Sequence, residues 1–219
     1  MFRTRHLVAS LAWPLLAACN SGDGYYPDFV GPSGPTANVQ FLHASSDAPP
    51  VDVIIDGQLA VGDLDFGQGT GEQPIAATSH TLTIQAETPG MPTTVIGPTT
   101  LTLQANTDYV IVAEGPAASI APVIFPHTLS VVAATSTRVQ VLHAAPSAPD
   151  VSVFLTAPGA DLTTTSPLGT FAFQGSVGPT DVASGPYEIR ITAAGTTAPV
   201  LYDSGPITCL LYTSPSPRD

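Results

Sequence analysis

The stretch that decides the fold is VQFLHASSDAPPVDVIIDG, Val39–Gly57, because a close copy of it returns 100 residues later. That copy is VQVLHAAPSAPDVSVFLTA, Val139–Ala157. Farther on the match resumes at an offset of 107, where Phe66 aligns with Phe173. The seven extra residues fall within 156–167, where a surface loop accommodates an insertion at little cost. The chain therefore holds two copies of one domain.

Inside each copy the hydrophobic pattern has a period of two residues. Val39, Phe41 and His43 lie on one face of a strand, with Gln40 and Leu42 on the other. Pro and Gly interrupt such runs roughly every eight to twelve residues, a spacing typical of sandwiches. The sequence predicts an all-β chain of two tandem immunoglobulin-like antiparallel β-sandwich domains, the second one incomplete.

The domain boundaries follow from the repeat and from composition. We predict a lipoprotein signal peptide at 1–18, a lipidated flexible tether at 19–36, a first sandwich at 37–135, a second at 136–208 and a tail at 209–219. In the first copy a Gly-Pro pair is followed by LTLQANTDYVIVAEG and then VIFPHTLSVVA, which supply two or three further strands. In the second copy only Ile207 and Thr208 follow the matching Gly-Pro pair, so those strands are predicted to be missing.

The tail CLLYTSPSPRD, Cys209–Asp219, abruptly leaves the strand pattern before it. It resembles one reading frame of a translated sequencing-library adapter. We therefore expect it to be non-native, with the natural protein continuing beyond Thr208 and with Cys209 no biological thiol. The alternative is a genuine short tail.

The N-terminus, MFRTRHLVASLAWPLLAACNSG, has the layout of an export signal. Arg3 and Arg5 precede an apolar stretch that is too short to span a bilayer. The segment Leu16–Cys19 resembles a bacterial lipobox, which makes Cys19 the predicted lipidation site and membrane anchor. Asn20, rather than Asp, follows it, which favours the outer membrane in the Gram-negative sorting pattern. The alternative is an ordinary secreted protein in which Cys19 is incidental.

Charge and composition exclude several classes of protein. Residues 20–208 carry 16 acidic side chains against Arg138 and Arg190, a net charge of −14, and the chain has no Lys. Nucleic acid is therefore not an expected partner, because binding a polyphosphate requires basic residues. No apolar run reaches the eighteen residues or so of a membrane-spanning helix. Two cysteines cannot form a disulfide framework.

The motifs of the repeat are similar to those of a known family. LHASSDAPPVDVIIDG, Leu42–Gly57, and LTLQANTDYVIVAEG, Leu101–Gly115, resemble the bacterial domain-of-unknown-function family 4397. The resemblance implies an exported protein, often lipidated and often with tandem copies, and no established activity. The second copy departs from the pattern by having Ser147, Ser152 and Thr156 where the first has Asp47, Asp52 and Asp56. Any acidic site is therefore confined to the first copy.

The repeated histidines, His43 and His143, end the first strand of each copy just before a Pro-containing turn. A hydrogen bond to the backbone of that turn explains them best, so we assign them a structural role. Metal binding and catalysis are alternatives, although neither has a second His at the usual zinc spacing. His80 and His127 are isolated in sequence and are predicted to lie at the surface or in turns.

An acidic loop region in the first copy contains Asp47, Asp52, Asp56, Asp63 and Asp65, whose oxygens could bind Ca²⁺. They do not match the twelve-residue calcium loop, and the ability of Asp to form turns explains them as well. The stretch GQGTG, 67–71, has no following helix or Lys to form a phosphate loop. There is no nucleophile-elbow motif. We therefore predict no enzyme, no catalytic residues and no cofactor.

The function expected from these features is that of a non-catalytic cell-envelope lipoprotein. Its domains would act as a surface or periplasmic interaction module for an envelope protein or glycan. The alternatives are a purely structural envelope protein and a Ca²⁺-dependent binding module.

Overall fold

The structure, a computed structural model, describes residues 6–10, 34–88, 90–128, 132–133 and 135–209. β-strands account for most of this part of the chain, and its only helical segments are two short 3₁₀ helices, Ala117–Ser119 and Leu162–Thr164. The predicted all-β class is confirmed. Cys19 and nearly all of the predicted leader and tether lie outside the described residues. Within the described ranges, no helix is long and apolar enough to cross a membrane.

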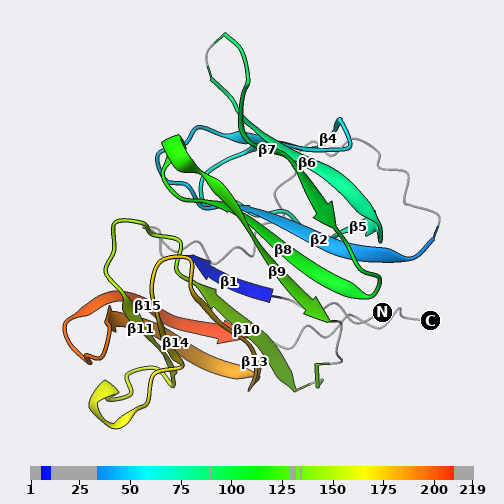
Figure 1. Cartoon of the computed structure of the whole chain (residues 1–219). Coiled ribbons are helices and arrows are strands. Elements are labelled where there is room, and N and C mark those ends of the chain that lie inside the picture. Colours follow the sequence, from blue (N-terminus) through cyan, green and yellow to red (C-terminus); the bar gives the residue numbers. More distant parts are fainter. Residues whose placement is uncertain (1–5, 11–33, 89, 129–131, 134, 210–219) are drawn as a thin grey trace, which may run out of the picture. The chain divides into compact units, whose positions relative to one another are not determined.

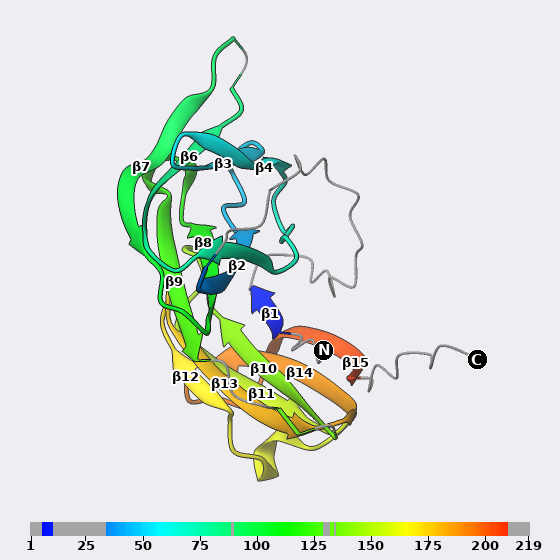
Figure 2. The ribbon, with the colours of Figure 1, turned by 90° about the vertical axis from the view of Figure 1, so that its right-hand side faces the viewer.

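The chain divides into two compact units (Figure 1). The first, here called the first sandwich, contains β2 (Thr36–His43), β3 (Val51–Ile55), β4 (Gln58–Leu64), β5 (Gln73–Ala76), β6 (Ser79–Ala86), β7 (Thr93–Thr102), β8 (Thr107–Glu114) and β9 (Ala121–Thr128). They form two four-stranded sheets of order β5-β2-β8-β9 and β4-β3-β6-β7. The layers can be followed from the side in Figure 2.

The core of the first sandwich is a single apolar cluster to which side chains of both sheets contribute. Every second residue of β2 is buried, and Val39 and Phe41 are at most 2% exposed. From the other sheet, Val51, Val53 and Leu82 are at most 1% exposed. The period of two in the sequence thus places one face of each sheet in the core.

One pairing in the first sandwich differs from the expected antiparallel pattern: β2 pairs with β8 in parallel. A parallel pair needs a long crossover connection rather than a hairpin. The chain between β2 and β8 supplies one, because it passes through the whole of the other sheet on the way.

The second unit, the second sandwich, contains β1 (His6–Ser10), β10 (Ser136–Leu142), β11 (Val151–Thr156), β12 (Gly169–Phe171), β13 (Ser176–Ala183), β14 (Gly185–Ala193) and β15 (Val200–Cys209). Its sheets have the orders β1-β10-β13 and β12-β11-β14-β15. Cys209, the first residue of the predicted tail, is the last residue of β15 and lies opposite Gly185.

The two units have corresponding strand orders. β10 to β15 occupy the places of β2 to β7, and the register agrees: β3 pairs Val51 with Ala86 and Leu64, and β11 pairs Val151 with Ala193 and Phe171. Val151 and Val153 are buried like their counterparts in β3, as the repeat predicts. Within the described residues, no strand of the second sandwich corresponds in sequence to β8 or β9.

Two glycines sit at irregular points of the ladders and cannot carry a side chain. Gly97 in β7 has φ +85°, and an added Cβ would lie 2.4 Å from the carbonyl oxygen of Leu82. Gly178 in β13 has φ +99°, and its Cβ would lie 2.6 Å from the carbonyl oxygen of Val139. Both ladders shift register at these points. The glycines therefore permit the β-bulges that bend these strands.

Candidate functional site

His43 and His143 end corresponding strands and are completely buried. The Nε2 atom of His43 lies 3.2 Å from the carbonyl oxygen of Pro49, and that of His143 lies 3.1 Å from the carbonyl oxygen of Pro149. In each case Nε2 donates to the following turn, the contact that the sequence predicts. The backbone N–H of Ser45 donates to Nδ1 of His43 at 3.4 Å, which assigns this imidazole the neutral form.

The same two histidines also join a second loop to the strand end. The His43 N–H donates to the carbonyl of Gln68, and the His43 carbonyl accepts from Gly67. His143 makes the corresponding pair of bonds with 174 and 175. The rings of Phe66 and Phe173 meet the imidazoles edge to face. Burial lowers the pKa of His43, although the nearby carbonyls of Pro49 and Ala113 oppose this. The arrangement is that of a structural residue.

His80 is not at the surface, which corrects the prediction from its isolation in sequence. It is 9% exposed in β6, where Nδ1 lies 2.6 Å from a carboxylate oxygen of Asp56 and Nε2 lies 2.8 Å from the carbonyl of Ala76. Burial lowers its pKa, but the hydrogen bonds to Asp56 and Ala76 outweigh burial, so the pKa of His80 is raised. His127, in β9, is also buried rather than exposed.

Asp56 completes the tight turn between β3 and β4. Asp56 and Gly57 both have positive φ, as the favoured two-residue hairpin loops require. The other carboxylate oxygen of Asp56 accepts the Thr81 N–H at 2.7 Å. The hydrogen bond from Thr81 is the main reason that the pKa of Asp56 is lowered. Burial acts against it, and the bond from His80 lowers the pKa further. Asp56 therefore stabilises both the β3–β4 turn and the contact of that turn with β6.

The structure does not bring Asp47, Asp52 and Asp56 together. Asp47 accepts the N–H of Ala117 at 2.9 Å, while Asp52 accepts the N–H of Asp63 at 3.0 Å. Asp52 and Asp56 are four residues apart along β3 and its turn, about 13 Å in an extended chain. Within the described ranges, no group of three or more His, Cys, Asp or Glu side chains is arranged to hold a metal ion.

Asp52, which is half-buried, lies instead in a small acidic group with the exposed Asp63 and Glu87. The pKa of Glu87 is raised, first by a hydrogen bond with Asp63 and then by the negative charges of Asp63 and Asp52. Of the three, Asp63 lies on the edge strand β4, where a charge opposes pairing with another strand. Asp65, the fifth acidic candidate, is a turn residue whose carbonyl accepts from Gln68.

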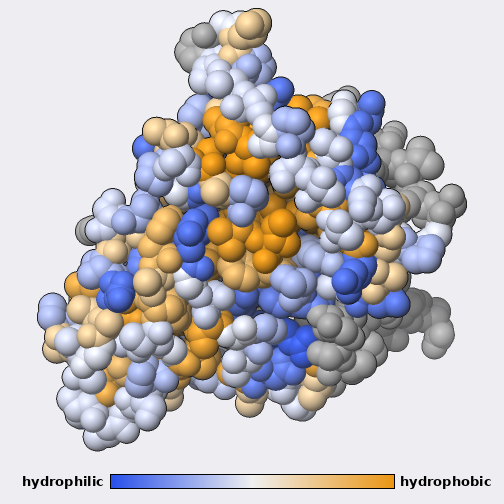
Figure 3. All heavy atoms as spheres, in the orientation of Figure 1, coloured by the Kyte–Doolittle hydropathy of each residue, from blue (hydrophilic) through white to orange (hydrophobic). Residues whose placement is uncertain are grey.

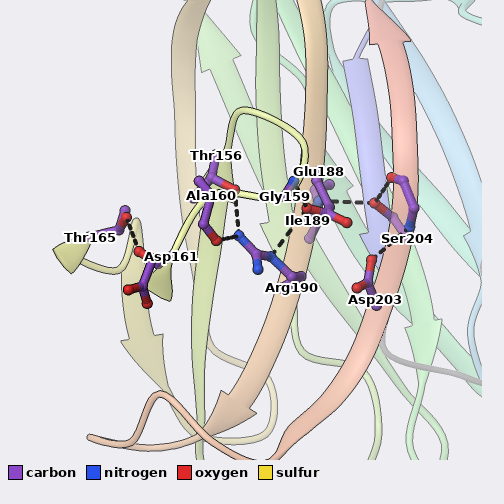
Figure 4. Close-up of polar contacts among 11 residues, drawn as sticks. Thr156, Gly159, Ala160, Asp161, Thr165, Glu188, Ile189, Arg190, Asp203 and Ser204 are labelled. Carbon is purple, nitrogen blue, oxygen red and sulfur yellow. Dashed lines mark hydrogen bonds and ion pairs between the residues drawn. The ribbon is translucent and has the colours of Figure 1, made fainter. Parts of the chain in front are cut away.

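The densest polar cluster was not predicted and belongs to the second sandwich (Figure 4). Arg190 and Glu188 lie on the same face of β14, with side chains only 12% and 11% exposed, and pair at 3.4 Å. Arg190 donates to the Thr156 hydroxyl at 3.0 Å and to the Ala160 carbonyl. Glu188 accepts the Gly159 N–H at 2.8 Å. The pair therefore fastens the β11–β12 loop to the sheet.

The other arginine of the domains is also paired. Arg138 in β10 makes a two-pronged contact with Asp181 in β13, at 2.7 and 2.9 Å. The hydrogen bond from Arg138 lowers the pKa of Asp181. One signal for both pairs was in the sequence: two arginines in a domain region without Lys, one of them two residues from Glu188 on a strand.

Comparison with known families gives one match. A family model described as a domain of unknown function (DUF4397) matches residues 37–154, which is more than half of the chain. The match covers the first sandwich from Ala37 onward and continues through β10 into β11. None of the curated proteins matches the chain. The chain belongs to the DUF4397 family.

Proposed function

We propose that this protein is a lipid-anchored, non-catalytic interaction protein of the bacterial cell envelope, held in the outer membrane through Cys19. The sequence before Cys19 supports the anchor, since a basic start, a short apolar run and small residues precede a single thiol. A diacyl anchor adds about 0.8 kcal/mol for each buried methylene group, so two or three chains suffice for stable attachment.

The proposal includes a second copy of the DUF4397 domain in the second sandwich. The observation that carries it is the matching geometry of His43 and His143, each donating to the carbonyl six residues later and meeting a Phe edge to face. The corresponding strand orders add to this. Six strands thus take corresponding places in the two units, and the polar contacts at the ends of β2 and β10 correspond as well.

The polar groups that could have served catalysis are used by the fold, which supports a non-catalytic role. His43 contacts backbone through both ring nitrogens, and His80 is held between Asp56 and a carbonyl. The net charge of −14 over residues 20–208 favours an envelope protein or glycan over nucleic acid as partner. A purely structural envelope protein is the second candidate. The separation of Asp47, Asp52 and Asp56 gives no support to the Ca²⁺-dependent alternative.

The anchor is tested by replacing Cys19→Ala in cells fed a labelled fatty acid, with Cys209→Ala as the matched control. We expect the wild type and the control to carry label and to enter the detergent phase on Triton X-114 separation. Cys19→Ala should lose the label and enter the aqueous phase. A wild-type protein that stays unlabelled and aqueous would contradict the anchor.

The interaction role is separated from the structural one by crosslinking in intact cells. An interaction module should give a discrete adduct of fixed stoichiometry, which excess soluble protein from residue 20 onward displaces. A structural protein should give no such adduct, and its deletion should weaken the envelope against detergent. Absence of any displaceable adduct would reject the interaction role.

A further inference from the structure

The hairpin that joins β6 to β7 extends beyond the other strands of the first sandwich (Figures 1 and 2). Its ladder continues as far as Ala86 opposite Thr93, so only a short connection lies beyond the paired residues. The residues that the structure describes in this connection, 87–88 and 90–92, are all exposed. Figure 3 shows the hairpin end standing clear of the surrounding surface, with apolar atoms among the polar ones.

Met91 is the large apolar residue of this connection. Its exposed fraction is 76%, and the other large hydrophobic side chains that are exposed in the described residues, such as Leu201 at 51%, are more covered. A Cβ added to the neighbouring Gly90 would meet nothing within 4 Å, so the surroundings are open. The protein therefore does not shield the thioether sulfur of Met91 from small molecules in the solvent.

Hydrogen bonds hold the backbone around Met91 in one conformation. The hydroxyl of Thr88 donates to the carbonyl of Met91, and its oxygen lies 3.1 Å from the hydroxyl oxygen of Thr93. Pro92 restricts the chain directly after Met91. A fixed turn thus presents the side chain of Met91 at the end of the hairpin.

Met91 also carries the only sulfur atom in residues 20–208. The other methionine is Met1, and the two cysteines are Cys19 and Cys209. The second copy of the repeat has Ala198 before the proline that matches Pro92. An oxidant that transfers an oxygen atom to sulfur therefore has a single target in this region, and that target lies on the surface rather than in a core.

We propose that Met91 is a reversible oxidation site, which a small neutral oxidant of the peroxide or hypohalous-acid class converts to the sulfoxide and a methionine sulfoxide reductase restores. With hydrogen peroxide, an S–O bond forms as the O–O bond breaks, and sulfur loses the two electrons that the peroxide gains. The proton of the transferred oxygen goes to the departing hydroxide, which leaves as water. In the reverse step two thiols of the reductase become a disulfide, and the oxygen leaves as water.

The charge of the protein selects among oxidants. Residues 20–208 carry a net charge of −14, which repels anionic oxidants such as hypochlorite but not neutral hydrogen peroxide or hypochlorous acid. Because Met91 is exposed, its sulfoxide adds polar surface without entering a core, and the fold should be kept. The inference goes beyond the proposed function and does not depend on lipidation of Cys19.

The test treats the full chain, with its two cysteines alkylated, with one equivalent of hypochlorous acid and locates the added oxygen by peptide mapping. We expect Met91 to react at a rate within about threefold of that of N-acetylmethionine amide, because reactivity follows exposure. The matched control is Leu101→Met, which places a second sulfur in β7 at a position that is 2% exposed. In that variant Met91 should take up oxygen at least about tenfold faster than residue 101.

Further measurements decide whether the modification is reversible and separate from the fold. The thermal unfolding midpoint should be the same before and after oxidation, and Met91→Leu should take up no oxygen in the β6–β7 connection. Methionine sulfoxide reductases of both stereospecificities, supplied with dithiothreitol, should together remove the oxygen from the folded protein. Slow oxidation of Met91, equal oxidation of residue 101, a lowered midpoint, or a sulfoxide that the reductases leave in place would overturn the inference.

Discussion

The β3–β4 hairpin of the first sandwich and the β11–β12 connection of the second occupy corresponding places in the two strand orders but are built in two ways. The first turns in two residues, Asp56 and Gly57, and the second takes the chain from Thr156 to Gly169 through a 3₁₀ helix. Both nevertheless return to the same register, with Val51 opposite Leu64 and Val151 opposite Phe171. The register is thus set by the buried valines rather than by the turn.

The outer faces of these two hairpins differ as much as their turns. In β3, Asp52 and Ile54 are half-buried, whereas their counterparts Ser152 and Phe154 in β11 are at most 2% exposed. The longer loop of the second sandwich carries the buried Leu162 and is fastened by Arg190 and Glu188. The first sandwich instead uses Asp56 with His80. Loss of an acidic turn residue is therefore matched by a new ion pair on the neighbouring strand.

The largest difference in stability between the two units should appear when they are separated. We expect residues 37–135 to unfold cooperatively and residues 136–208 to be poorly folded or to aggregate. Without β1, and with no counterpart of β8 or β9, the second fragment exposes β10 and part of its apolar face. At about 25 cal/mol per Å², that loss exceeds the roughly 5–15 kcal/mol by which a domain is normally stable.

Thermal circular dichroism and size-exclusion chromatography of the two fragments check this expectation. The first fragment is the control for expression and handling. A soluble, monomeric 136–208 with a cooperative melt would mean that the second sandwich needs no neighbour for β10.

The next largest effect should come from Arg190→Met, because it strands the carboxylate of Glu188 in a site that is almost buried. Breaking such a pair costs about 3–5 kcal/mol. Thr83→Ala, at the corresponding position in β6, should change stability by no more than about 0.5 kcal/mol. Hydrogen exchange in β11 and β14 measures this loss of stability separately from the first sandwich, and we expect it to be faster in Arg190→Met.

A second substitution tells a buried ion pair from simple packing. Glu188→Leu added to Arg190→Met should restore part of the lost stability, since it removes the unpaired charge. A double variant that is less stable than Arg190→Met would show that the charge of Glu188 is not the cause.

The smallest effect concerns His80, whose pKa is raised above its usual value of 6.5. Its contribution to the stability of the first sandwich is fully present below pH 6.5 and is lost as the pH rises through the raised value. Asp56 stays ionised throughout, because its pKa is lowered. The effect should be modest, as the Asp56 side chain is 53% exposed and screened by solvent.

Urea unfolding of fragment 37–135 at pH 6, 7 and 8.5, with an NMR titration of the His80 ring, checks this. We expect the unfolding midpoint to fall with rising pH in the wild type and to fall less in Asp56→Asn. An imidazole of His80 that titrates below 6.5 would reverse the assigned sign.

Much of the fold could be predicted because it is carried by apolar residues at a regular spacing. The period of two in β2 and β3 and the offset of 100 located the strands, their buried faces and the insertion. The parallel pairing of β2 and β8 could not be predicted, because local pattern does not report the direction of a partner far away in sequence. The contact of His43 with its turn followed from a repeated residue at a strand end.

The candidate polar sites were harder to predict, since they depend on pairs from different strands. The sequence predicts a surface position for His80 because its partner, Asp56, is 24 residues away in sequence. The pair of Arg190 with Glu188 was visible as neighbours on one strand face, but its use in holding a loop depends on the insertion itself. The place of β1 could not be predicted at all, since a leader is normally set aside before the fold is considered.

The turn at Asp56 and Gly57 also has a practical use. The second sandwich carries a twelve-residue loop, 157–168, at the corresponding place and keeps its register, so this hairpin end accommodates added chain. A fluorophore-binding tag or an epitope placed after Gly57 should therefore leave both sheets of the first sandwich intact. Such an insertion would allow the protein to be followed in living cells while its N-terminus stays unmodified.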